Sequence, residues 1–236
     1  MKSRPKVIAF DVVETLFSLE PMRGRLRALG LPPEALETWF AQLLRNAFAL
    51  DASGGYKPFG EVARSTLDVL VAEFNRTTDP ASLDQALAGL SDLLAHPDVA
   101  PAFELLHKAG VRIITLTNGH ADNTRQLLHR ARLDGFVERV ISIDEVRRWK
   151  PAREVYLHAA EAVKVAPDEL ALVAAHAWDV HGASRAGLVT GWVSRLEKRF
   201  LPVMNPPDVT GDTLGEVSRK LLALPPAAPS AETQQV

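Results

Sequence analysis

The chain has 236 residues, of which 47% are hydrophobic and 24% charged, and it has a formal charge of -2 and no cysteine. This composition is typical of a globular protein with a substantial core and argues against disordered and membrane-spanning classes. The small negative charge gives no reason to expect a nucleic-acid partner, and the lack of cysteine excludes disulfides and thiolate chemistry. No apolar run is long enough to cross a bilayer and no signal-peptide core precedes the first strand, so we expect a cytoplasmic protein without a membrane partner.

The first predicted element is a short apolar strand that begins at Val7 and ends in a carboxylate, Asp11. In an open α/β sheet, ligands bind just past the carboxyl ends of the strands. Thr15, four residues further on, is near enough to hydrogen-bond that carboxylate. On its own, this stretch slightly favours a simple turn cap as the role of Asp11, so the rest of the chain has to decide between the two interpretations.

Residues 18–97 follow this strand and have apolar residues at helical spacing, with breaks at Pro32-Pro33, 52–55 and 77–80. A crossover between parallel strands needs far fewer residues than this. We therefore expect an all-helical insertion, a cap domain placed where it can cover the cleft next to Asp11.

From residue 98 the chain alternates between strands and helices, which predicts a doubly wound parallel sheet with right-handed crossovers. The fold class is therefore α/β and Rossmann-like, with residues 1–17 and 98–224 in the core domain. The Pro-, Ala- and Gln-containing end, 225–236, is expected to be a disordered tail. We expect further strands over 111–117, 140–143, 170–174 and 190–194, and helices over 99–109, 120–132, after Pro151 and over 182–187.

Polar side chains follow several of these strands, and the carboxyl ends of parallel strands meet at one edge of a sheet. Each residue alone has a structural explanation as a turn, a cap or a surface residue, and we interpret Arg147-Arg148-Trp149 as solvated surface. Together, however, they predict one crevice around Asp11. The residues at these strand ends are Thr117, Asn118, Lys150, Tyr156, His176 and Asp179.

This set of side chains is suited to covalent catalysis by a carboxylate. Asp11 can act as a nucleophile that splits one difficult displacement into two easier steps. Lys150 would balance its charge, and Asp179 would orient Lys150 and position water. Thr117 and Asn118 are neutral donors that suit a substrate carboxylate or phosphate.

Four motifs, in the order in which they occur, resemble those of the haloacid dehalogenase superfamily. They are Phe10-Asp11-x-x-x-Thr15-Leu16-Phe17, Thr117-Asn118-Gly119, Lys150-Pro151 with Tyr156, and Ala177-Trp178-Asp179. More narrowly, they resemble its type II (S)-2-haloacid dehalogenase branch over nearly the whole chain. The resemblance implies a displacement without metal or cofactor, in which Asp11 expels halide from a short 2-haloalkanoate and water hydrolyses the aspartyl ester. It also implies a homodimer. By the same resemblance, Thr15, Lys150 and Asp179 support Asp11 as the nucleophile. The substrate pocket would be formed by Val12, Val13, Thr117, Asn118, Tyr156, His176 and Trp178.

The sequence also departs from this branch at three positions. Glu14 stands where Gly is usual, His176 where Asn is common, and Phe40 aligns with the cap Arg that binds substrate or halide; Arg45 is the nearby candidate replacement. Phosphatases of the superfamily have an acid where this chain has Val13, which cannot donate a proton to a leaving group. Two alternatives stay open: a phosphatase with a degenerate metal site, and a binder of small carboxylates without turnover.

Overall fold

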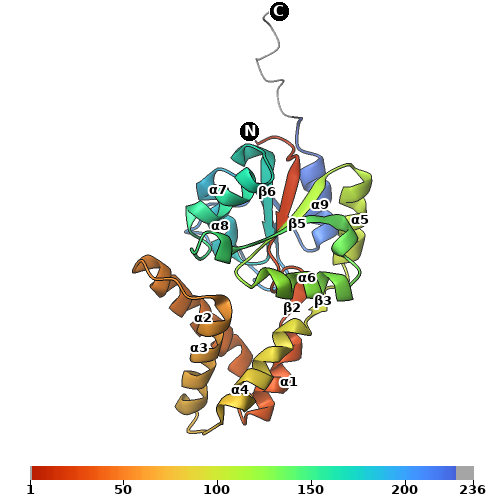
Figure 1. The fold of residues 1–236 in the computed structure, drawn as a ribbon. Helices are drawn as coiled ribbons and strands as arrows, with labels where there is room; N and C mark the ends of the chain where they lie inside the picture. Colours follow the sequence, from red (N-terminus) through yellow and green to blue (C-terminus); the bar gives the residue numbers. More distant parts are fainter. Residues whose placement is uncertain (1, 227–236) are drawn as a thin grey trace, which may run out of the picture.

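A computed structural model describes residues 2–226, so most of the predicted tail lies outside the described residues. Its centre is a six-stranded sheet in which every neighbouring pair is parallel, with strand order β5-β4-β1-β6-β7-β8 (Figure 1). This arrangement confirms the predicted α/β class. The strands are β1 (Val7–Phe10), β4 (Arg112–Thr117), β5 (Val137–Ser142), β6 (Leu170–Ala174), β7 (Val189–Val193) and β8 (Val209–Gly211).

Strand β1 lies in the middle of the sheet because all four of its residues are apolar and buried on both faces. It pairs with β4 on one side and β6 on the other, and the register places Phe10 next to Thr115 and Val173. Asp11 therefore emerges at the carboxyl edge between its two neighbouring strands.

Helices cover both faces of the sheet: α5 and α9 lie on one face, and α7 and α8 on the other (Figure 1). Gly187 ends α8 with a φ of 100°, a left-handed conformation that glycine adopts without strain. The core helices are α5 (Val99–Lys108), α6 (Ala121–Arg130), α7 (Arg153–Ala162), α8 (Ala177–Ala186) and α9 (Leu214–Leu222), with short 3₁₀ turns η2 (Asp134–Phe136), η3 (Ile143–Glu145) and η4 (Pro167–Glu169).

The segment after β1 forms a separate group of helices beyond the carboxyl edge of the sheet (Figure 1). It leaves and re-enters the sheet region through a two-stranded antiparallel ribbon, β2 (Phe17–Ser18) and β3 (Leu94–Ala95). This segment corresponds to the predicted insertion 18–97, and its action as a cap stays a prediction. Its helices are α1 (Glu20–Ala28), α2 (Ala35–Ala52), α3 (Phe59–Glu73) and α4 (Pro80–Leu87), followed by the 3₁₀ turn η1 (Ala88–Ser91).

Some element boundaries differ from those that the sequence predicts. Strand β5 begins at Val137 rather than 140, because the polar Glu138 and Arg139 of this edge strand are exposed and interrupt the apolar run. Helix α8 begins at Ala177 rather than 182, and β8 and α9 were not predicted at all. None of the helices within residues 2–226 has both the length and the apolar content needed to cross a membrane.

Candidate active site

Asp11 follows the last residue of β1, and its side chain is only 9% exposed. Its backbone N–H donates to the Val173 carbonyl at 3.0 Å, which extends the pairing of β1 with β6 by one residue. The Thr15 hydroxyl donates to Asp11 Oδ2 at 2.7 Å and accepts from the Ala175 N–H at 2.9 Å. One carboxylate oxygen of Asp11 is thus fixed by the backbone of two neighbouring strands.

The Lys150 ammonium lies beside Asp11 and is completely buried. It donates to Asp11 Oδ1 at 2.8 Å, to Asp179 Oδ2 at 2.6 Å and to the Leu116 carbonyl at 3.0 Å. Its three donors are all used, which satisfies the whole hydrogen-bonding capacity of an ammonium group. Burial lowers the pKa of Lys150, but the two carboxylates outweigh this effect and raise it above its ordinary value.

Asp179, in the first turn of α8, completes a cluster of two acids and one cation without solvent access. Burial raises the pKa of Asp179 to about 6, against the lowering effect of Lys150, because one ammonium balances only one of two buried carboxylates. The Tyr156 hydroxyl donates to Asp179 Oδ1 at 2.6 Å, and burial next to this acid raises the pKa of Tyr156. Gly182 permits this contact, since a Cβ there would lie 2.6 Å from the Tyr156 hydroxyl oxygen.

A small cavity of about 20 Å³ lies against Asp11. Asn118 lines it, and its Oδ1 accepts from the Lys150 N–H at 3.1 Å, which leaves the Nδ2 donors available. Thr117 accepts from the Gly119 N–H at 2.9 Å, so its hydroxyl hydrogen is available as well. This volume holds about one water molecule. The other lining residues are Val13, Phe40, Leu44, Phe59, Gly119, His176 and Trp178.

Three rings form the wall of this cavity on the side of α2. The rings of Phe40 and His176 are 5.8 Å apart between centroids, and those of His176 and Trp178 are 5.5 Å apart. His176 Nδ1 lies 3.9 Å from Asp11 Oδ2 and has no hydrogen-bond partner among the described residues. Burial lowers the pKa of His176.

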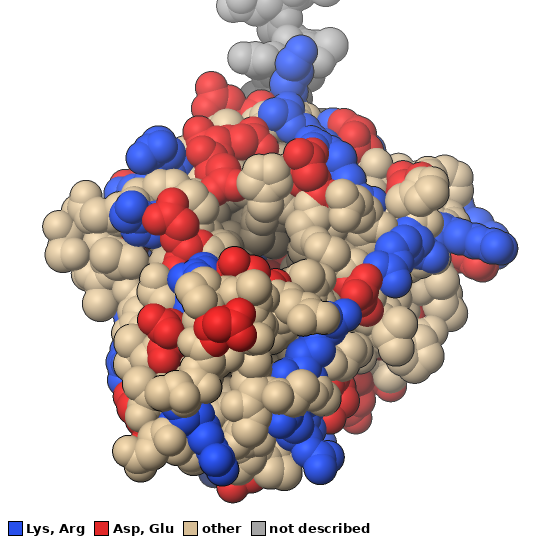
Figure 2. Space-filling model, turned by 60° about the horizontal axis from the view of Figure 1, so that its bottom comes forward, with Lys and Arg blue, Asp and Glu red and all other residues tan. Residues whose placement is uncertain are grey.

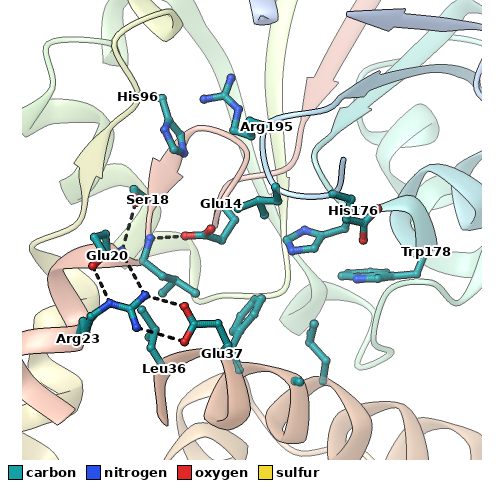
Figure 3. Close-up of a pocket in the computed structure, with 16 residues that line it drawn as sticks. Glu14, Ser18, Glu20, Arg23, Leu36, Glu37, His96, His176, Trp178 and Arg195 are labelled. Carbon is teal, nitrogen blue, oxygen red and sulfur yellow. Dashed lines mark hydrogen bonds and ion pairs between the residues drawn. The ribbon is translucent and has the colours of Figure 1, made fainter. Parts of the chain in front are cut away.

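Beyond these rings, a groove of about 780 Å³ extends between the core and the helical segment. Figure 3 shows His176 and Trp178 on one side of it and Glu14, His96 and Arg195 on another. The face drawn in Figure 2 is hollowed near its centre, with acidic and basic side chains mixed around the hollow. The groove therefore gives a route from solvent to the rings that close the cavity at Asp11.

The structure shows the surroundings of Glu14, which stands where Gly is usual, and of Arg45, the candidate replacement for the cap Arg. Glu14 has a φ of 67°, the left-handed region that glycine adopts without strain, and its carboxylate accepts from the Leu19 N–H. Burial raises the pKa of Glu14. Arg45, by contrast, does not reach the site: its side chain is exposed and donates to Asn46 of the same helix at 3.1 Å. The expectation that Arg45 replaces the cap Arg is therefore wrong, because helix α2 turns this residue to solvent.

The segment before Lys150 is solvated surface only in part: Arg147 is exposed as we expected, but Arg148 is half-buried and Trp149 is buried. Trp149 is fully buried and its indole N–H donates to the Lys57 carbonyl at 3.0 Å. Arg148 forms a two-pronged ion pair with Asp51 at 2.9 and 3.0 Å. These contacts join the end of α2 to the loop that carries Lys150, and long-range pairing of this kind gives no signal in a single sequence.

The described residues do not provide a metal centre of the usual kind. Within residues 2–226 there is no group of three or more His, Asp or Glu side chains placed to hold a metal ion. The two acids of the buried cluster, Asp11 and Asp179, both bind the Lys150 ammonium.

Comparisons with known proteins agree with this fold. One relative, (S)-2-haloacid dehalogenase 1 of Pseudomonas sp. (strain CBS-3), is 27% identical over 82% of this chain and 86% of its own length. Glyceraldehyde 3-phosphate phosphatase of Methanopyrus kandleri is 26% identical, with coverages of 86% and 90%. This chain also superposes on the structure of L-2-haloacid dehalogenase from Xanthobacter autotrophicus with chloropropionic acid covalently bound. The TM-score is 0.86 at 24% sequence identity, and the match covers 93% of this chain and 99% of that one. The family model for haloacid dehalogenase-like hydrolases matches residues 5–187, well over half of the sequence, and the chain therefore belongs to this family.

Proposed function

We propose that this protein is a 2-haloacid dehalogenase that hydrolyses short 2-haloalkanoates, such as chloroacetate or fluoroacetate, through an ester on Asp11. The observation that carries this proposal is the Lys150 ammonium, fully buried and bonded to both Asp11 and Asp179. A fixed ammonium balances the charge of the nucleophilic carboxylate and holds its orientation without a metal ion. The relative from Pseudomonas, a named (S)-2-haloacid dehalogenase, supports the same chemistry.

In the first step, a carboxylate oxygen of Asp11 forms a bond to C2 of the substrate while the carbon–halogen bond breaks, and halide leaves with the electron pair. Thr15 and Lys150 each donate to one oxygen of Asp11, so the carboxylate cannot rotate away from the reacting carbon. In the second step, water cleaves the ester at Cγ of Asp11, which releases a 2-hydroxy acid and a proton. Asp179 acts through Lys150, as a positioning residue.

The substrate carboxylate needs several hydrogen-bond donors next to Asp11. The Asn118 Nδ2 and the Thr117 hydroxyl face the cavity without protein acceptors among the described residues. The backbone N–H groups of Val12 and Val13 likewise donate to no backbone or side-chain acceptor within residues 2–226. Together these groups form a neutral donor set of the kind that binds carboxylates.

The leaving halide would lie against the rings of Phe40, His176 and Trp178, because no Lys or Arg lines the described cavity. Aromatic ring edges carry partial positive charge and can accommodate a halide. The cavity holds only about one water molecule, so substrate entry requires α2 to move away from the sheet edge. This requirement supports assigning residues 18–97 as a mobile cap.

A phosphatase is the second candidate, and the similarity to glyceraldehyde 3-phosphate phosphatase favours it. Phosphoryl transfer needs metal ions to neutralise charge and a proton for the leaving group. Val13 supplies no proton, and both acids of the cluster bind Lys150. These features favour the dehalogenase. A carboxylate binder without turnover is a third reading, which the apolar Phe40 supports.

The test measures halide release from chloroacetate, fluoroacetate and both enantiomers of 2-chloropropionate, with a metal chelator present. We expect release by the wild type and none by Asp11→Asn. Hydrolysis of phosphomonoesters only, dependent on Mg²⁺ and without halide release, would assign the phosphatase instead. Binding of haloacids without any release would assign the third reading. From the family resemblance we also propose a homodimer in the cytoplasm, which light scattering and cell fractionation test.

A further inference from the structure

We propose that His176 is the general base that activates water for hydrolysis of the Asp11 ester. This inference rests on the proposed function and concerns its second step. His176 lies directly after β6 and before α8, so its backbone is at the same sheet edge as Asp11. Its Nδ1 is 3.9 Å from Asp11 Oδ2, too far for a hydrogen bond but near enough for a water molecule on Nδ1 to approach Cγ of Asp11.

The Nδ1 atom of His176 is buried and has no partner among the described residues, and the residue as a whole is 8% exposed. A buried polar atom without a partner destabilises the folded protein, because its hydrogen bonds to water are lost and not replaced. Such an atom facing the proposed nucleophile is best explained by a partner that arrives during the reaction. Water is that partner, because the cavity next to it has room for about one water molecule.

The ring of His176 also packs against two aromatic rings, Phe40 from α2 and Trp178 from α8. All three side chains border both the small cavity at Asp11 and the large groove (Figure 3). His176 therefore stands where water from the groove meets the ester, with its orientation set by packing.

The charges around His176 favour its neutral form, which a base requires. Burial lowers the pKa of His176 and Lys150 adds to this, while Asp11 and Glu197 oppose it without reversing it. Glu14, His96 and Arg195 line the same groove further away, and the contact from α2 is the apolar Phe40. With the proton on Nε2, Nδ1 is free to accept one from water.

Asp179 is the other candidate base, but its oxygens are already engaged. Asp179 Oδ2 accepts from Lys150 and Oδ1 from Tyr156, and the carboxylate has no exposed surface. It borders neither the cavity nor the groove. His176, by contrast, has an acceptor atom without a partner among the described residues and lines both the cavity and the groove.

The water oxygen bonds to Cγ of Asp11 while His176 Nδ1 takes one of its protons. The bond between Cγ and the ester oxygen then breaks, and the protonated His176 returns its proton to that oxygen, which leaves as the hydroxyl of the 2-hydroxy acid. The new Asp11 carboxyl releases its proton to solvent and becomes a carboxylate again.

Rapid-quench measurements of halide release test this assignment in His176→Phe, which keeps an aromatic ring, and in His176→Asn, which keeps a small polar group. We expect both to release a burst of one halide per active site and then turn over at least about 100-fold more slowly than wild type, as loss of a general base predicts. Mass spectrometry should find the ester on the peptide containing Asp11. The exposed His129 provides a matched control variant, His129→Phe, with wild-type rates.

Steady turnover of both variants within threefold of wild type, without accumulated ester, would overturn the assignment. So would loss of the burst itself in a variant with an unchanged unfolding midpoint, because His176 would then act in the first step. Absence of halide release by the wild type would be a different failure, that of the proposed function.

Discussion

Replacing Lys150 with Met should destabilise the fold most strongly at alkaline pH. The side chain is completely buried and its ammonium donates to Asp11, Asp179 and the Leu116 carbonyl. Met fills a similar volume but leaves two buried carboxylates without their cation. Removing one partner of a buried ion pair costs about 3–5 kcal/mol, and we expect a loss of this size in the free energy of unfolding at pH 8.

The pH dependence follows from the pKa of Asp179. In the wild type, burial raises this pKa to about 6, above the ~3.9 of an aspartate in the unfolded chain. Protonated Asp179 therefore adds to the free energy of unfolding below pH ~4, and this contribution is lost as the pH rises to about 6. Without the Lys150 charge, which lowers that pKa, the folded variant retains its proton to higher pH. Its free energy of unfolding then continues to fall above pH 6, by up to about 1.4 kcal/mol per pH unit.

The assay is urea unfolding of the wild type and Lys150→Met at pH 6, 7 and 8, followed by circular dichroism. Lys108→Met, at an exposed position, is the control and should match the wild type at each pH. We expect a difference that grows from pH 6 to pH 8. A variant as stable as the wild type at pH 8, or a difference independent of pH, would refute the reasoning about the buried cluster.

Three further predictions concern the same site. Tyr156→Phe leaves Asp179 Oδ1 without its donor and should lower the free energy of unfolding by about 1–3 kcal/mol at pH 8, measured in urea; an unchanged midpoint would contradict this. Phe40→Arg places a cation on the cavity wall, and a charged hydrogen bond to the substrate contributes about 1.5 kcal/mol or more. We therefore expect the KM for chloroacetate to fall about tenfold in initial-rate assays. A higher KM would count against our placement of the substrate. The rate of halide release by the wild type should rise between pH 5 and 7, because Asp179, with a pKa of about 6, must ionise to hold Lys150. A rate that falls over this range would be inconsistent with that role of Asp179.

Much of the site could be predicted because the sheet is parallel. Strands β1, β4 and β6 are neighbours, so residues that follow them, such as Asp11, Asn118 and His176, had to meet at one edge. The apolar runs of these strands are buried on both faces and are plain in the sequence. Helix α9 could also have been found, because Thr213 followed by Glu216 is a helix-start signal, and the Thr213 side chain accepts from the Glu216 N–H.

Other features depend on contacts between distant residues and could not be predicted. The pairing of Asp51 with Arg148 joins positions far apart in the chain and leaves no local pattern. The rotation of α2 about its axis, which exposes Arg45 and directs Phe40 to the site, is set by packing. The two residues are five positions apart and therefore lie about 140° apart around the helix. The left-handed conformation of Glu14 was not predicted either, although the bond that its carboxylate accepts from the Leu19 N–H is a local one.

The measurement that tests covalent catalysis by Asp11 most directly is a single turnover in ¹⁸O-labelled water with enzyme in excess over 2-chloropropionate. If a carboxylate oxygen of Asp11 attacks C2, the hydroxyl oxygen of the product comes from the protein, so the first 2-hydroxy acid formed is unlabelled and the ¹⁸O appears in the peptide containing Asp11. Label in the product of that first turnover, with none in Asp11, would mean that water attacks the carbon directly and would contradict the account.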